Sequence, residues 1–115
     1  MIVKKKNRVR HENSPKCIAY EYPMKDKDIS AAFVEIKGRY PDEGQVTNEI
    51  VKELVFVLGG KGKIVIDNKE HELSEGDSIL IIPKQKYFFD GTLELIVSCS
   101  PAWYQEQHKI DREQS

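Results

Sequence analysis

The sequence predicts an all-β domain, and three observations carry that prediction. Short apolar or alternating runs recur at intervals of about 8–12 residues, which is the spacing of strands in β-sandwiches and barrels. Gly, Pro, Asn and Asp gather between these runs, where turns require them. No stretch shows the 3.6-residue period of a long amphipathic helix. Together these features predict seven or eight short strands packed as a sandwich or jelly roll.

Length and composition indicate one globular domain spanning residues 1–115. A chain of 115 residues buries about two thirds of its unfolded surface, which is enough for a single core. Hydrophobic residues make up 39% of the chain and charged residues 32%, as in ordinary soluble proteins. No apolar run approaches the roughly 18 residues that span a bilayer, and the N-terminus does not resemble a secretory signal. We therefore expect a cytoplasmic protein with no membrane partner.

Residues 1–16 are predicted to form a basic N-terminal arm that ends in a loop. Residues 1–10 contain five Lys and Arg and no acid, so they carry +5 of a net charge of −1 and leave −6 for the remainder. A basic arm on an acidic body could bind nucleic acid, but no nucleic-acid motif or aromatic residue accompanies these charges. We expect the arm to be solvated or to lie on a partner subunit, with no nucleic-acid partner.

The first half of the domain contains two predicted strands. Residues 17–22 and 30–37 alternate between apolar and polar side chains, and Pro23 ends the first of these runs. Residues 38–44 are bounded by glycines and are predicted to be a loop. Residues 45–52 have no clean period, so their structure is left open.

The middle of the chain is predicted to form β-hairpins. Residues 54–58 are an apolar run too short for a helix, and the pair Gly59-Gly60 is expected to end it. Residues 61–67 alternate, as a half-buried strand does. Asp67-Asn68 is a turn signal, because both residues tolerate left-handed backbone angles.

The second half of the domain continues the β pattern. Residues 74–77 form a predicted turn, and residues 78–82 are apolar on both faces, as in a strand buried on both sides. Residues 87–90 are a short aromatic strand, and residues 92–100 alternate cleanly. Residues 101–115 are predicted to be a polar C-terminal tail with at most one helical turn.

The middle stretch resembles the cupin family. The first cupin motif ends with a glutamate, a hydrophobic strand and a glycine seven residues later, and Glu53 and Gly60 have that spacing. The second motif runs from Gly-Asp across a short strand to a proline, as Gly76-Asp77 and Pro83 do with one residue more than usual. The resemblance covers roughly residues 30–100. It implies a cupin-like double-stranded β-helix, also called a jelly-roll barrel.

The resemblance also implies where a metal would bind. Metal-binding cupins use two histidines and a glutamate from the first motif and a histidine from the second, a set suited to Fe, Mn, Ni or Zn. The corresponding positions here hold no histidine: they are Thr47 and Glu49, or Val46 and Asn48, and Phe88. No cofactor is therefore predicted. A divalent transition metal would need the unusual set Glu49, Glu53 and His108, in which the first two share strand parity if residues 47–58 are extended.

Glu53 and His108 are the candidate catalytic residues. Glu53 shares parity with Val55 and Val57, so its carboxyl group should point into the barrel. Burial costs free energy unless the carboxyl group is hydrogen-bonded, and it raises the pKa. Glu53 is thus either a strand-end residue paired with a lysine or hydroxyl, or a pocket acid or base. In an enzyme, Glu53 would be the general base and His108 the general acid.

The candidate ligand-binding residues come from both motifs and the tail. Tyr87, Phe88 and Phe89 fall where the second motif lines the pocket, so either Tyr87 and Phe89 or Phe88 alone should face inward. These rings could equally fill an ordinary core. Trp103 is expected to pack on the barrel or close its mouth, and His108 to lie on the surface or turn inward. The full set is Thr47, Asn48, Glu49, Val55, Val57, Tyr87, Phe89 and Trp103.

Three functions remain open at this stage. The first is a small-molecule-binding cupin that holds a sugar-like or carboxylate ligand without a standard metal site. The second is an enzyme of isomerase, lyase or oxygenase type that uses Glu53 with an atypical metal or metal-free acid–base chemistry. The third is a structural or regulatory module whose barrel is filled by side chains. The family resemblance adds an expected homodimer, and the fold alone cannot choose among these functions.

Overall fold

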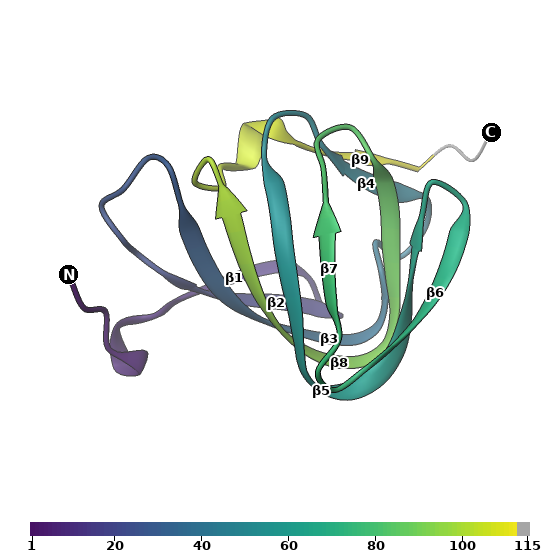
Figure 1. Ribbon diagram of the computed structural model, residues 1–115, viewed down its shortest axis with the longest axis horizontal. Helices are drawn as coiled ribbons and strands as arrows, with labels where there is room; N and C mark the ends of the chain where they lie inside the picture. The colour runs from purple at the N-terminus through teal and green to yellow at the C-terminus, as the bar shows by residue number, and fades with distance from the viewer. Residues whose placement is uncertain (113–115) are drawn as a thin grey trace.

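The computed structural model describes residues 1–112 and consists almost entirely of strands that curl into a half-barrel (Figure 1). Within the described residues one sheet contains nine strands. They are β1 (Val9–Ser14), β2 (Cys17–Tyr22), β3 (Ser30–Tyr40), β4 (Gln45–Asn48), β5 (Lys52–Ile66), β6 (Lys69–Ser74), β7 (Ser78–Ile81), β8 (Lys86–Ser100) and β9 (His108–Asp111). Two single turns of 3₁₀ helix, η1 (Lys5–Asn7) and η2 (Gln105–Gln107), complete the described chain.

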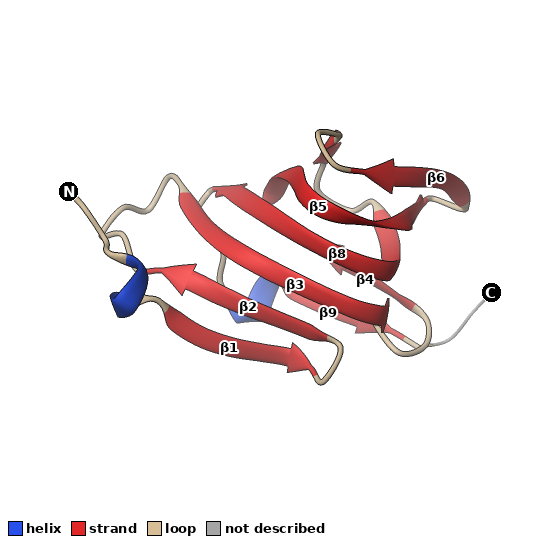
Figure 2. Ribbon diagram, turned by 90° about the horizontal axis from the view of Figure 1, so that it is seen from below, coloured by secondary structure: helices blue, strands red, loops and turns tan. Residues whose placement is uncertain are grey.

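β8 is the strand around which the sheet is built. It pairs with β3 on one side and with β5 on the other, and its first two residues also pair with β4. The strand order is β1-β2-β3-β8-β4-β9, while β5 carries β6 and β7. Figure 2 shows β1 and β2 at one edge and the β5–β6 hairpin at the other. Because β5 and β8 each have 15 residues, they can bend around the core and close much of the barrel.

The strand β5 runs through Gly59-Gly60, where the sequence indicated a break. A register shift between Val57 and Gly59 against β8 marks a bulge at this point, and a bulge bends a strand without ending it. Gly60 has a φ of 89°, and a Cβ there would collide with the backbone of Thr92. The glycine pair therefore curves the sheet. The predicted turn at Asp67-Asn68 is confirmed, with φ values of 48° and 68°.

Both ends of the chain are more ordered than the sequence indicated. Residues 9–14, predicted as arm and loop, form β1 and pair with β2. Residues 38–40, predicted as loop, extend β3. In the predicted tail 101–115, η2 supplies the one helical turn, and β9 pairs with β4; residues 113–115 lie outside the described part.

The register shows which side chains share the concave face. Residues directly opposite in an antiparallel pair point to the same side. One row across the sheet reads Val9, Glu21, Ala32, Val97 and Val55, and the adjacent row reads Ser30, Cys99 and Glu53. Glu21 and Glu53 therefore face the same interior from different strands.

The convex face of the sheet is partly apolar. The sequence predicted β7 to be buried on both sides, but only Ile81 is buried, and Leu80 and Ile82 are 55% and 49% exposed. Leu54 and Phe56 on β5 are 53% and 45% exposed. The prediction was wrong because one face of β7 has no second layer over it. The expected homodimer stays a prediction. Among residues 1–112, no helix is long and apolar enough to cross a membrane.

Candidate functional site

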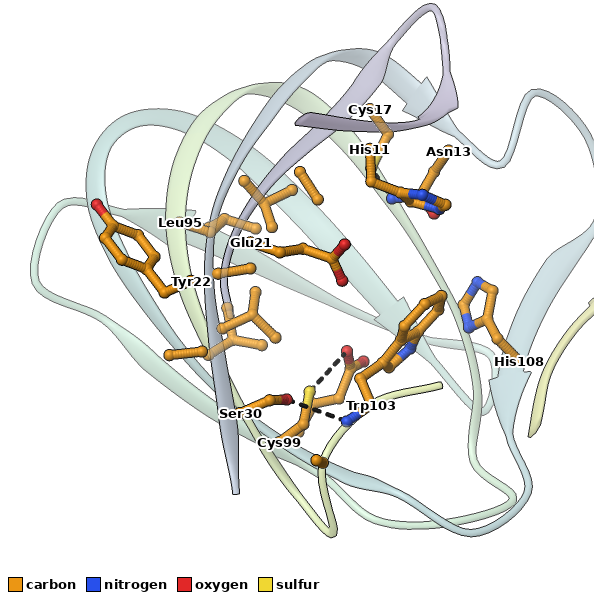
Figure 3. A pocket seen from close by; sticks show the side chains of 18 of the residues that line it. His11, Asn13, Cys17, Glu21, Tyr22, Ser30, Leu95, Cys99, Trp103 and His108 are labelled. Atoms are coloured by element: carbon orange, nitrogen blue, oxygen red, sulfur yellow. Dashed lines mark hydrogen bonds between the residues drawn. The ribbon is translucent and has the colours of Figure 1, made fainter. Parts of the chain in front are cut away.

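A cavity of about 340 Å³ opens on the concave face of the sheet (Figure 3). One wall is apolar and includes Ala19, Ala32, Val34, Val55, Leu95 and Val97. The polar groups come from His11, Glu21, Tyr40, Glu53, Tyr87 and His108. Within residues 1–112, no lysine or arginine lines the cavity. This volume is sufficient for a small organic molecule.

Glu53 lies in this cavity at the centre of a hydrogen-bonded group. Its Oε1 atom accepts hydrogen bonds from the Tyr87 hydroxyl at 2.6 Å and from Asn48 Nδ2 at 3.0 Å. Its Oε2 atom lies 3.7 Å from Cys99 Sγ. Glu53 is only 9% exposed. We call Glu53, Asn48, Tyr87 and Cys99 the Glu53 cluster.

Burial favours the neutral form of the Glu53 carboxyl group. Burial raises the pKa of Glu53, while the hydrogen bonds from Tyr87, Asn48 and Cys99 lower it by less. The pKa of Tyr87 is raised well above its ordinary value by burial and by the neighbouring carboxyl group, so the phenol keeps its proton. Because Oε1 already accepts two hydrogen bonds, the acid proton belongs on Oε2. Glu53 can therefore donate as well as accept.

Backbone amides determine which way the neighbouring side-chain amides point. Gln107 Oε1 accepts from the backbone N–H groups of Ile50 and Val51, at 3.3 and 3.1 Å. Gln107 Nε2 must then donate to Asn48 Oδ1, at 2.9 Å. Asn48 Nδ2 is consequently directed at Glu53. A backbone N–H cannot act as an acceptor, so this orientation follows from donor and acceptor chemistry.

The same chain of contacts determines the tautomer of His108. His108 Nδ1 lies 2.9 Å from Asn48 Oδ1, which can only accept, so Nδ1 carries the proton. His108 Nε2 then accepts from the Tyr40 hydroxyl at 3.1 Å. Burial lowers the pKa of His108 to about 4, with a smaller contribution from His11. The imidazole is therefore neutral at neutral pH. The roles of general base for Glu53 and general acid for His108, considered from the sequence, stay a prediction.

A second carboxyl group faces the same cavity from β2. The Glu21 side chain points into the space near His11 and Trp103 (Figure 3). Among residues 1–112 its carboxylate has no hydrogen-bond or ion-pair partner. The Trp103 ring lies between His11 and His108, with centroid distances of 5.8 and 5.6 Å. The backbone N–H of Trp103 donates to Ser30 Oγ at 3.0 Å and anchors this segment.

The structure brings together most of the residues that the sequence predicted for the site. Glu53, Val55, Tyr87, Phe89, Trp103 and His108 line the cavity. Asn48 lies behind this lining and bonds Glu53. Val57 points inward but is fully buried in the core. Thr47 is on the opposite side of β4 from the buried Asn48, and its buried Oγ1 has no hydrogen-bond partner in the described chain.

The proposed metal set is not assembled. Glu49 is exposed, and its carboxylate lies 4.0 Å from Lys109 Nζ. The parity prediction failed because residues 49–51 form a turn between β4 and β5, which breaks the alternation. Residues 1–112 contain no group of three His, Cys, Asp or Glu side chains that could hold a metal ion. The residues present do not fit a cupin metal.

Several residues of the site were not predicted from the sequence. Glu21, His11, Tyr40, Gln107 and Cys99 were not nominated, although all line the cavity or support the Glu53 cluster. A signal for Glu21 was present: on β2 it shares a face with the small residues Cys17 and Ala19, which leave room for a ligand. The pairing of Gln107 with Asn48 spans 59 residues, so no local pattern could indicate it.

The fold matches solved structures at low sequence identity. No family model and no curated protein matches the sequence. Pac13 from Streptomyces, described as a nucleoside dehydratase and also solved with uridine, superposes with a TM-score of 0.88 at 16% identity, covering 100% of this chain and 93% of Pac13. An RmlC-like cupin from Shewanella frigidimarina has a TM-score of 0.71 at 17% identity, covering 86% and 88%.

KdgF from Halomonas sp. superposes with a TM-score of 0.70 at 15% identity, covering 92% of this chain and 97% of KdgF. At these identities the likeness concerns the fold. The curled sheet, the spacing of Glu53 and Gly60, and the superpositions agree, and the chain therefore has a cupin-like fold.

Proposed function

We propose that this protein binds a small, hydroxyl-bearing and non-anionic molecule of the sugar-like class inside the barrel. The observation that carries this proposal is the Glu53 cluster, a buried carboxyl group bonded to a phenol within a cavity of about 340 Å³. Ligand sites commonly combine an apolar wall with a few convergent polar groups, as this cavity does.

The charge of the lining favours one of the two ligand classes expected from the sequence. No lysine or arginine of the described chain lines the cavity, whereas Glu21 and Glu53 both do. An anionic ligand would lose its hydration without gaining a cationic partner. A sugar-like ligand needs only donors and acceptors, which Glu53 Oε2, the Tyr40 hydroxyl and Tyr87 can supply. We therefore retain the sugar-like class and not the carboxylate class.

The comparison with Pac13 is consistent with this choice. Its solved structures with uridine place an uncharged, hydroxyl-bearing molecule in that protein. With 16% identity, the comparison supports the class of ligand by analogy only. The open cavity also makes a barrel filled by its own side chains the weaker alternative, since Tyr87 and Phe89 line the space without occupying it.

Binding to purified protein tests this proposal. Uridine, D-ribose and D-glucuronate would be titrated at pH 7.5 while amide shifts are followed by NMR. We expect saturable shifts around Glu53 with the uncharged probes and none with D-glucuronate. Glu53→Gln should keep binding, because an amide reproduces the donor and acceptor of the neutral acid, and Glu53→Leu should lose it. Glu49→Gln, which changes an exposed carboxylate, is the control.

Two outcomes would contradict the proposal. One is binding of D-glucuronate in preference to both uncharged probes. The other is undiminished binding of the uncharged probes to Glu53→Leu, which would mean that the ligand does not contact the Glu53 cluster.

A second candidate function is acid–base elimination of water from such a ligand. Neutral Glu53 could give its Oε2 proton to a departing hydroxyl group while Tyr40 takes a proton from the adjacent carbon and passes its own to His108 Nε2. The C–H and C–O bonds break, a C=C bond forms, and water leaves. The pKa of His108 near 4 makes it a weak base, so the C–H bond would need activation by a carbonyl group.

Glu53→Gln separates binding from this chemistry. If elimination occurs, the variant should bind a β-hydroxy ketone as the wild type does but release water at least about 100-fold more slowly, as followed by proton NMR. Equal rates for both proteins would exclude Glu53 as the acid.

A further inference from the structure

Two carboxyl groups of the described residues line the cavity, and Glu21 is the one that does not belong to the Glu53 cluster. It stands on β2, opposite Val9 on β1 and Ala32 on β3, and Figure 3 shows its carboxylate in the cavity near Trp103. Its side chain is half-buried, and within residues 1–112 no donor contacts it. An unpaired carboxylate beside apolar side chains is costly unless a cation or donors complete it.

The two arginines next to Val9, the residue opposite Glu21, are directed elsewhere. Arg8 and Arg10 flank Val9, and because side chains alternate along a strand they point to the convex side. The Arg8 guanidinium lies 4.6 Å from the centroid of the Tyr20 ring. Arg10 pairs with Glu12 at 3.2 Å. Neither can neutralise Glu21 without leaving these contacts.

The aromatic ring beside Glu21 suits a cation. Trp103 lines the same part of the cavity and is held by its backbone bond to Ser30 Oγ. Indole faces attract ammonium groups more strongly than other aromatic side chains do. A carboxylate and an indole on the same side of a cavity without a lysine or arginine form a site of negative potential.

We propose that Glu21 and Trp103 form a subsite for a cationic nitrogen, so that the natural ligand is an amino-bearing, hydroxylated molecule such as an amino sugar. This inference rests on the proposed function, because it assigns the second end of the same ligand. The hydroxyl groups would bind at the Glu53 cluster and the ammonium group at Glu21. Charge selectivity then comes from Glu21 and hydroxyl recognition from Glu53.

The test isolates the cation from the rest of the ligand. n-Propylammonium chloride and 1-propanol share the same propyl chain, but the first carries an ammonium group where the second carries a hydroxyl group. The binding of each can be followed by NMR at the indole N–H of Trp103. We expect n-propylammonium to bind at least about 10-fold more tightly than 1-propanol. Glu21→Gln should bring this ratio to about 1. Glu12→Gln, an exposed carboxylate on the neighbouring strand, should leave it unchanged.

D-glucosamine and D-glucose provide the second arm. We expect D-glucosamine to be favoured at least about 10-fold by the wild type and to lose this preference in Glu21→Gln, with D-glucose binding unchanged. Equal affinities of the ammonium and hydroxyl probes for the wild type would overturn the cationic subsite. Binding of D-glucose that depends on Glu53 would still leave the proposed function standing.

A metal ion is the other cation that Glu21 could attract. Zn²⁺ and Mn²⁺ would be titrated in the same assay. Shifts that depend on Glu21 and appear with either metal but not with n-propylammonium would overturn the assignment to a nitrogen cation.

Discussion

Glu53 and Glu21 are the same residue type on the same concave face, yet they differ in burial and in hydrogen bonding. Glu53 is 9% exposed and is bonded by Tyr87 and Asn48. Glu21 is half-buried and has no partner among the described residues. Burial raises the pKa of Glu53, which favours its neutral form. The described neighbours of each carboxyl group therefore determine its role. Those of Glu53 supply its hydrogen bonds, whereas those of Glu21 supply none and leave it available to a ligand.

The largest expected effect comes from breaking the Glu53 cluster. Glu53→Ala removes the acceptor for two buried donors, Tyr87 O–H and Asn48 Nδ2, and should lower the free energy of unfolding by about 3 kcal/mol at pH 7. Urea denaturation of the purified variant measures it. Glu21→Ala, which breaks no bond within the chain, should change stability by less than about 0.5 kcal/mol. Equal losses for the two variants would remove the distinction between the carboxyl groups.

The pH dependence of Glu53 has a defined sign. Its pKa is raised above the unfolded value, so the folded state binds more protons and its stability falls as pH rises from about 4.5 through the folded pKa. Glu53→Gln cannot ionise. The free energy of unfolding of the wild type minus that of Glu53→Gln should therefore decrease with rising pH. A difference that stays flat would mean that the carboxyl group is not perturbed.

His108 should show the opposite pH dependence. Its pKa falls from 6.5 to about 4 on folding, so the unfolded state binds more protons between these values. The stability contributed by the neutral imidazole is complete above about pH 6.5 and is lost as pH falls toward 4, by up to about 3 kcal/mol. The difference in unfolding free energy between wild type and His108→Gln, measured by urea denaturation from pH 4 to 8, checks this. A difference that grows on acidification would contradict it.

Gln107 is expected to have a smaller effect that NMR can identify. Gln107→Leu removes the acceptor for two backbone N–H groups and should cost about 2 kcal/mol. It also frees Asn48 to rotate, so His108 should lose its preference for the Nδ1–H tautomer, which ¹⁵N shifts of the imidazole report. Gln107→Glu keeps the backbone acceptor but loses the donor to Asn48. An unchanged tautomer in Gln107→Leu would show that Asn48 needs no such support.

The sequence could predict the fold because its signals are local. Turns at Asp67-Asn68 and at residues 74–77, and the strand at residues 17–22, depend on neighbouring residues and lie where they were expected. The spacing of Glu53 and Gly60 indicated the cupin architecture, which the superpositions confirm. Inward orientation of Glu53 and Val55 followed from strand parity, whereas parity left open whether Tyr87 and Phe89 or Phe88 alone faces inward.

The arrangement of the site could not be predicted, because it depends on residues far apart in the chain. Parity placed Glu49 beside Glu53, but a turn at residues 49–51 separates them. Gln107 and Asn48, 59 residues apart, meet only because β9 pairs with β4. That pairing orients His108, and burial lowers its pKa to about 4.

The sequence by itself determined the class of fold, the curled barrel and the inward position of Glu53, because strand alternation and turn residues act over a few residues. Only the tertiary structure decided that Glu53 is satisfied and Glu21 is not. Burial and hydrogen bonding are properties of the assembled neighbourhood, and β2, β5, β8 and the C-terminal segment contribute to it together. For this reason the chemistry of the cavity can be derived only from the assembled strands.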